Sequence, residues 1–141
     1  MSDQTASGAC LCGAVRFEIR LPSKWMAHCH CSMCRRAHGA GFVTWVGMDA
    51  DRVAIRSGDN ALRRYHSSPA AVRSFCGICG STLFFESTRW AGEVHVARAN
   101  LLDPIDRQPQ AHAFFSDRVD WISVDDNLPR YGGPSGTEPL H

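Results

Sequence analysis

The seven cysteines of this chain constrain its fold more than any other feature, because they fall into three groups with short spacings. The groups read CLC at 10–12, CHCSMC at 29–34 and CGIC at 76–79. An odd number of cysteines cannot all pair within one chain, so disulfides cannot use every thiol. We therefore expect these thiols to be reduced and to ligate metal ions.

Length and composition predict one ordinary domain. A chain of 141 residues is long enough to bury a core without disulfides, and 44% hydrophobic with 21% charged residues is near the globular average. The first residues, MSDQTASG, have neither the basic start nor the apolar run of a secretory signal. No segment approaches the roughly 18 apolar residues of a membrane span. A cytoplasmic location without a membrane partner is the expectation.

The charge balance argues against a nucleic-acid partner. The net charge is only +1, and the lysines and arginines are scattered along the chain. A protein that binds a phosphate backbone usually gathers them on one face or segment.

Alternating apolar residues predict a mostly β fold, a small antiparallel domain of short strands with one short helix. The helix begins near Ser32 and ends at Gly39. Along the chain, residues 1–7 are predicted to be a polar lead, 8–131 the zinc domain and 132–141, rich in Gly and Pro, a flexible tail. The segments that favour strands are 15–21, 42–46, 53–55, 62–65, 72–76, 83–86 and 93–97.

Two of the cysteine groups predict a structural zinc site. Cys10 and Cys12 lie two residues apart, so in extended backbone both can reach one ion. Cys76 and Cys79, with two neighbouring glycines, form the spacing of a tight metal-binding turn. Four thiolates fill a tetrahedral zinc and leave no position open. The simpler alternative is that Cys10 and Cys12 are ordinary small buried residues.

The third group predicts a reactive zinc. If residues 28–31 are extended, Cys29 and Cys31 face one side while His28 and His30 face the other, and a helical turn then returns Cys34 to the same ion. A zinc with three protein ligands keeps its fourth position for water or substrate. Three thiolates make this zinc a poor activator of water and suit it to hold a substrate sulfur as thiolate.

Two alternatives stay open for the third group. The seven cysteines could divide differently between two ions, or a protein histidine could close the site into a second structural zinc. The histidines available for closure are His28, His30, His38, His66, His95 and His112.

Five successive motifs carry a family resemblance. GACLCGAVRFEI, HCHCSMCRRAHG, FCGICGSTLFF, VARANLLDP and HAFFSDRVDWISVDDNLPRY resemble, in order from Gly8 to Tyr131, the glutathione-dependent formaldehyde-activating enzyme family, which shares its domain with centromere protein V. The resemblance implies a β-tent fold. It also implies two zinc cofactors per chain, a structural ion on Cys10, Cys12, Cys76 and Cys79 and a catalytic ion on Cys29, Cys31 and Cys34.

The same resemblance implies an activity. Members of the family are named for condensing glutathione with formaldehyde to S-(hydroxymethyl)glutathione, which is a carbon-sulfur lyase reaction in reverse. The partners would then be a small glutathione-like thiol and an aldehyde, with a homodimer possible. The alternative function is a non-catalytic binding module scaffolded by zinc.

Several nearby side chains are candidates for supporting roles. His30 or His38 could donate the proton that the adduct oxygen needs. Arg35 and Arg36 could bind a carboxylate of the thiol. The large aromatic residues could line a substrate pocket, but we favour positions in the core. These are Trp45, Trp121, Phe114 and Phe115.

Overall fold

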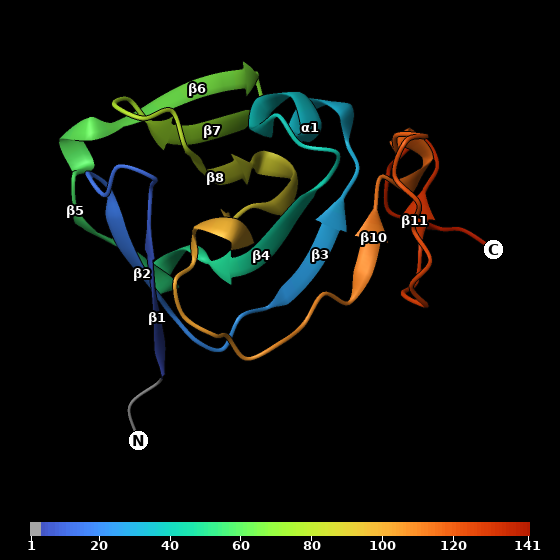
Figure 1. The fold of residues 1–141 in the computed structure, drawn as a ribbon, viewed down its shortest axis with the longest axis horizontal. Helices are drawn as coiled ribbons and strands as arrows, with labels where there is room; N and C mark the ends of the chain where they lie inside the picture. The colour runs from blue at the N-terminus through green and yellow to red at the C-terminus, as the bar shows by residue number, and fades with distance from the viewer. Residues whose placement is uncertain (1–3) are drawn as a thin grey trace.

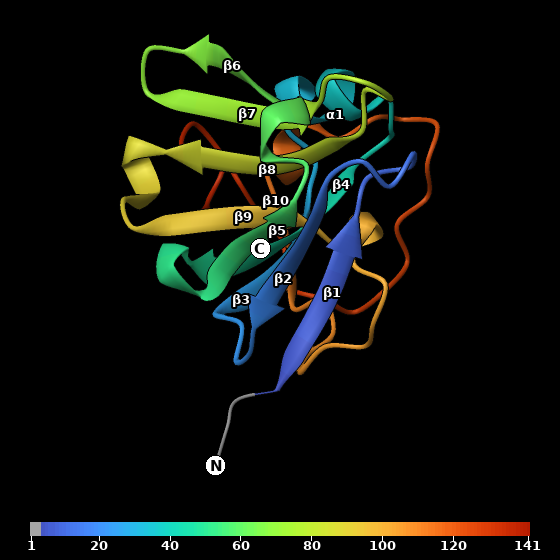
Figure 2. The same ribbon diagram turned by 90° about the vertical axis from the view of Figure 1, so that its left-hand side faces the viewer.

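Two β-sheets that share one core make up most of this fold, seen here in a computed structural model that describes residues 4–141 (Figures 1 and 2). The smaller sheet has the strand order β1-β2-β5 and is antiparallel. Its strands are β1 (Thr5–Ala9), β2 (Arg16–Arg20) and β5 (Val53–Ser57).

The larger sheet has seven strands in the order β10-β3-β4-β9-β8-β7-β6. All its pairs are antiparallel except β10 with β3, which run parallel. Its strands are β3 (Trp25–Cys29), β4 (Val43–Asp49), β6 (Leu62–Ser68), β7 (Ala71–Cys76), β8 (Thr82–Ser87), β9 (Glu93–Ala97) and β10 (Ala111–Ala113).

The remaining elements are short. Helix α1 (Ser32–His38) follows β3, and a small hairpin of β11 (Tyr131–Gly132) and β12 (Glu138–Pro139) lies near the C-terminus. Single 3-10 turns occupy Ala50–Arg52, Asp59–Ala61, Thr88–Trp90, Arg98–Asn100 and Phe115–Asp117. Within residues 4–141, no helix has both the length and the apolar character that crossing a membrane requires.

The predicted mostly β, antiparallel-rich fold with one short helix is confirmed. Each predicted strand segment overlaps an observed strand, from β2 and β4 through β9. The helix ends as expected, because Gly39 adopts the left-handed conformation (φ 60°) and its N–H donates to the Arg35 carbonyl.

Strands lie near both ends of the described chain. Strand β1 begins inside the predicted polar lead, and Ala6 is fully buried; residues 1–3 of that lead lie outside the described part. The predicted tail, 132–141, carries the hairpin strands and contacts the body of the protein. Arg89 donates to the Ser135 carbonyl and to the Thr137 hydroxyl, both at 3.0 Å. Contacts between segments so far apart in the sequence cannot be predicted from local composition.

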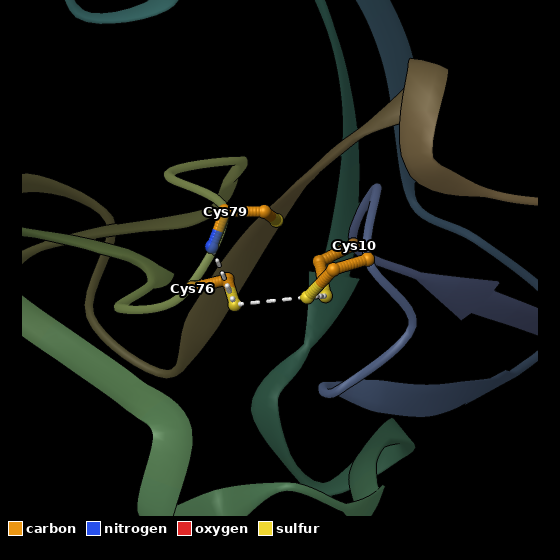
Figure 3. Close-up of side chains that lie close together, drawn as sticks. Cys10, Cys76 and Cys79 are labelled. Carbon is orange, nitrogen blue, oxygen red and sulfur yellow. Dashed lines mark hydrogen bonds between the residues drawn. The ribbon is translucent and has the colours of Figure 1, made fainter.

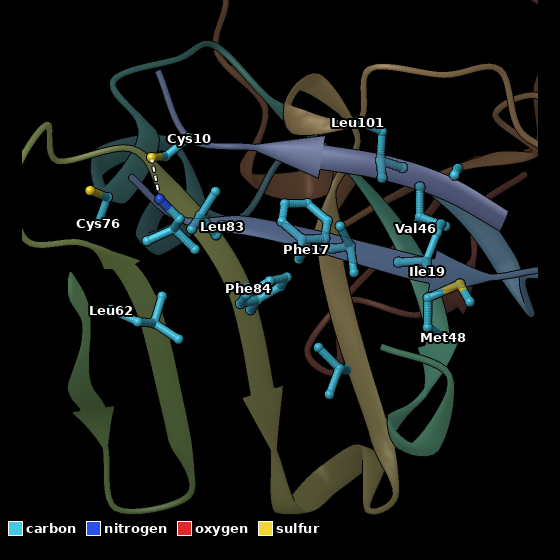
Figure 4. Close-up of a cluster of buried hydrophobic side chains, with 14 of the residues drawn as sticks. Cys10, Phe17, Ile19, Val46, Met48, Leu62, Cys76, Leu83, Phe84 and Leu101 are labelled. Carbon is cyan, nitrogen blue, oxygen red and sulfur yellow. Dashed lines mark hydrogen bonds between the residues drawn. The ribbon is translucent and has the colours of Figure 1, made fainter. Parts of the chain in front are cut away.

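The core lies between the two sheets. Phe17 of β2 meets Phe84 of β8 edge to face, with ring centroids 4.9 Å apart. Ile19, Val46 and Met48 around them are fully buried (Figure 4).

Because strand side chains alternate, the larger sheet presents a second face away from this core. In β4, Val46 and Met48 enter the core, whereas Val43 and Trp45 belong to a separate buried cluster with Cys29 and Cys34. This opposite face carries the cysteine-lined pocket described below.

Replacing Phe17 by alanine should lower the free energy of unfolding by about 3–5 kcal/mol, because the change leaves a cavity between the sheets. Leu11→Ala is the matched control, since Leu11 is 86% exposed and should change stability by less than about 0.5 kcal/mol. Urea unfolding of the metal-loaded protein measures both. Equal effects of the two substitutions would contradict the placement of the core.

Candidate functional site

The four cysteines of the first two groups come together from opposite sheets. Cys10 and Cys12 lie in the turn between β1 and β2, whereas Cys76 ends β7 and Cys79 lies in the turn before β8 (Figure 3). All four sulfurs lie within 4.8 Å of one another. The distance from Cys10 Sγ to Cys12 Sγ is 3.7 Å, and that from Cys12 Sγ to Cys76 Sγ is 3.8 Å.

These distances fit a zinc ion. A tetrahedral ion with zinc–sulfur bonds of about 2.3 Å separates its sulfurs by about 3.8 Å. Backbone N–H groups also point at the sulfurs: Val15 donates to Cys10 Sγ at 3.2 Å, and Ile78 donates to Cys76 Sγ at 3.4 Å. Such donors favour the ionised thiolate that a metal requires. This cluster of four could therefore bind one zinc.

Ser81 supports the same cluster from both sides. Its hydroxyl accepts from the Leu11 N–H at 3.0 Å and lies 3.2 Å from Cys79 Sγ. Hydrogen bonds from Ser81 lower the pKa of Cys79 to about 5. The turn itself needs Gly80 at φ 83°, where its N–H reaches the Cys76 carbonyl at 2.8 Å.

The third cysteine group lies at the end of β3 and the start of α1. Cys29 ends β3 and Cys34 lies on the buried side of α1, with their sulfurs 3.7 Å apart. Cys31 occupies the N-cap position, and its interaction with the Cys34 side chain raises the pKa of Cys31. The Cys29 and Cys34 sulfurs thus lie at metal-site spacing, with the Cys31 side chain next to Cys34.

The pKa values of the two close cysteines in this group shift in opposite directions. The contact between the two close sulfurs lowers the pKa of Cys29 and raises the pKa of Cys34. Arg73 of β7 donates through Nη2 to Cys34 Sγ at 3.5 Å. A guanidinium in this position stabilises negative charge on the sulfurs.

The neighbouring histidines lie on the other side of β3. His28 Nδ1 is 2.8 Å from the Thr44 hydroxyl, and His30 Nε2 is 2.8 Å from His112 Nδ1. His112 in turn contacts Asp126 at 2.9 Å. Burial lowers the pKa of His30 to about 4, so this imidazole is neutral near pH 7.

A cavity of about 700 Å³ opens on the cysteine side of the larger sheet. Cys29, Cys31 and Cys34 all line it, and among the histidines of the described residues only His95 does. The structure therefore places His30 and His38, the predicted proton donors, outside this pocket. Six aromatic side chains dominate its wall: Trp25, Trp45, Phe85, Trp90, Phe114 and Tyr131.

Some predictions for individual side chains need correction. Trp45 is buried as expected, but it also lines the pocket, whereas Trp121 is 70% exposed and not in the core. Arg35 is held by backbone carbonyls, those of His30 at 3.2 Å and Asp117 at 3.3 Å. Arg36 is exposed and does not line this pocket.

Arg73 is a pocket residue that sequence reasoning missed, and the sequence indicates His95 only as a possible zinc ligand. His95 Nε2 lies 3.0 Å from Glu93 Oε1, and Lys24 Nζ contacts the same carboxylate at 2.8 Å. Burial lowers the pKa of His95, so its neutral form is favoured. The alternation along 93–97 was the available signal, since it places residues 95 and 97 on one face.

Together, the fold and the sites define a small β protein with a four-cysteine cluster that could bind zinc, whose larger sheet carries a cysteine-lined aromatic pocket. A family model, that of the glutathione-dependent formaldehyde-activating enzymes, matches residues 5–117. The chain belongs to this family.

Comparisons with individual relatives agree with this family membership. A Halomonas elongata protein that is provisionally named a glutathione-dependent formaldehyde-activating enzyme is 30% identical over 126 residues, which are 84% of this chain and 80% of the relative. An uncharacterized lyase of Schizosaccharomyces pombe is 31% identical over 81 residues, 57% of each chain. A Rhodobacter sphaeroides protein of known crystal structure has a TM-score of 0.61 at 27% identity, covering 70% of this chain and 89% of its own.

Replacing Cys76 by serine should remove one zinc equivalent and abolish cooperative folding. Zinc binding at a closed thiolate site contributes roughly 10–16 kcal/mol, as much as the whole stability of a small domain. Metal analysis together with thermal unfolding by circular dichroism measures both effects. Cys31→Ser is the control, because it leaves the four-cysteine cluster intact and should keep the fold. A Cys76→Ser protein with normal zinc content and stability would contradict the structural role.

Proposed function

We propose that this protein is a zinc-dependent carbon-sulfur lyase-type enzyme that acts on the adduct of a thiol and an aldehyde. The observation that carries the proposal is the Cys29–Cys34 sulfur pair, at 3.7 Å, in the wall of a 700 Å³ pocket. Family membership supports it, and the names of the two relatives, a formaldehyde-activating enzyme and a lyase, agree with the reaction class.

We assign a structural role to one cysteine site and a catalytic role to the other. Cys10, Cys12, Cys76 and Cys79 would hold a structural zinc, and Cys29, Cys31 and Cys34 would hold a catalytic one. The donor set of the second site fits, because three sulfurs line one pocket and a cation lies beside them. When bound there, zinc supplies Lewis acidity that favours the ionised form of a thiol near neutral pH.

The residues of this chain would orient the reaction. In the synthetic direction, the thiol S–H bond breaks with loss of its proton, the sulfur forms a bond to the aldehyde carbon, the carbonyl π bond breaks and the oxygen takes a proton. The lyase direction reverses these changes. His95, held by Glu93, is placed to exchange that proton. The aromatic walls exclude water from the reacting sulfur.

The identities of the thiol and the aldehyde are also proposals. Glutathione and formaldehyde fit the family name. The cytoplasmic location, a homodimer and the lack of a nucleic-acid partner also stay predictions.

One observation favours a second candidate function, a non-catalytic binding module scaffolded by zinc. Among residues 4–141, the four-cysteine cluster is the one group of side chains whose ligand atoms gather as a metal site requires. In that case the four-cysteine cluster would be the only metal centre.

Replacing Cys29 by serine separates the two candidates. The enzyme proposal expects the loss of the second zinc equivalent and at least a hundredfold slower catalysed addition of a thiol to formaldehyde, because removal of a ligand disables the site. Exchange NMR measures this rate above the spontaneous reaction. Thermal stability should change little.

The control for this substitution is Arg36→Gln, an exposed position on α1, which should leave rate and zinc content unchanged. Wild-type protein that holds one zinc per chain and gives no rate above the spontaneous reaction would establish the binding module instead.

A further inference from the structure

We propose that the pocket selects a compact apolar ligand bearing one carboxylate, and that Arg73 binds this carboxylate. The inference rests on the proposed function for its chemistry: the natural thiol would be an α- or β-mercapto carboxylate with an aromatic or branched aliphatic substituent.

The first observation is the state of Arg73 itself. Its side chain is buried, with the residue only 6% exposed, and its guanidinium stacks over the Phe85 ring at 4.8 Å. Nη2 donates to Cys34 Sγ, but the buried Nη1 has no hydrogen-bond partner among the described residues. A buried charged group with a donor that lacks a hydrogen-bond partner lowers the stability of the folded protein. A bound anion would supply that partner.

The second observation is the chemistry of the walls. No Asp, Glu or Lys among the described residues lines the pocket, and six aromatic side chains do. The other arginine, Arg89, is already engaged: its guanidinium stacks on Trp90 at 4.6 Å and bonds Ser135 and Thr137. The pocket thus offers one available cationic donor in apolar surroundings, which matches one anion on an apolar body.

This arrangement suits glutathione poorly. Glutathione carries two carboxylates and an ammonium group, and this wall has no acidic side chain to pair with the ammonium. The position of Arg73 adds a distance constraint. Because its Nη2 lies 3.5 Å from Cys34 Sγ, an anion on the same guanidinium lies beside the sulfur group. The carboxylate should therefore be only a few bonds from the reacting sulfur.

The test uses a probe without sulfur, so that binding does not depend on thiol chemistry. Hydrocinnamate and its neutral isostere hydrocinnamide are titrated into the metal-loaded protein, and quenching of the fluorescence of Trp45 and Trp90 in the pocket wall reports binding. We expect the carboxylate to bind at least about tenfold tighter than the amide, as charge-assisted hydrogen bonds do.

Arg73→Gln should abolish this preference and change amide affinity by no more than about threefold, since the apolar walls remain. Arg64→Gln, an exposed position on β6 outside the pocket, should keep the preference. If Arg73→Gln fails to fold, Arg73→Lys replaces it and should weaken the preference, because lysine lacks the planar two-nitrogen fork.

The outcomes separate the two proposals. A preference that depends on Arg73 supports the subsite even in a protein with no lyase activity. Equal binding of carboxylate and amide overturns the subsite, even if the protein processes a glutathione adduct. An Arg73→Gln protein that changes only its zinc content and keeps the preference also overturns it, because Arg73 would then serve the metal alone.

Discussion

The contact on which this structure depends is the meeting of four sulfurs between two sheets. Cys10 and Cys12 belong to the turn of the small sheet, and Cys76 belongs to the large one, 64 residues from Cys12 along the chain. Cys10 and Cys76 are also members of the hydrophobic core. A metal ion bound by the four sulfurs would therefore stabilise the same region that core packing stabilises. It would link the two sheets beside the contact between Phe17 and Phe84.

The pairing of strands in the larger sheet also determines where the pocket forms. Because alternate residues face opposite sides, a strand such as β4 contributes Val46 to the core and Trp45 to the pocket. If the pairing of β4 shifted by one residue, Val46 would face the pocket and Trp45 would face the core. Trp45 pairs with Ala27 of β3 and Ala97 of β9, and these small partners leave room for the pocket beside it. The packing of this core thus holds the register that creates the pocket.

The sequence predicted the local features of this molecule and missed those that depend on distant pairing. The CLC and CGIC spacings identify the four-cysteine cluster because each pair of ligands lies within one turn, and Gly39 marks the end of α1 for a similarly local reason. Strand β1, with the sequence TASGA, has no strong alternation and forms by pairing with β2. The parallel pairing of β10 with β3, and the approach of Arg73 to Cys34, also arise from tertiary contacts. Local spacing could therefore group the three cysteines but could not set their distances.

Arg73 shows why the chemistry of the pocket could not be found from motifs. In the sequence it is one arginine in a strand, three residues before Cys76, and nothing local marks it as buried. Its meaning comes from the pairing of β7 with β8, which places its guanidinium over Phe85, and from α1, which brings Cys34 to the same point. A buried guanidinium is most stable when all its N–H groups have hydrogen-bond partners. Cys34 Sγ is the partner of Nη2, and the anion proposed for the pocket would be the partner of Nη1.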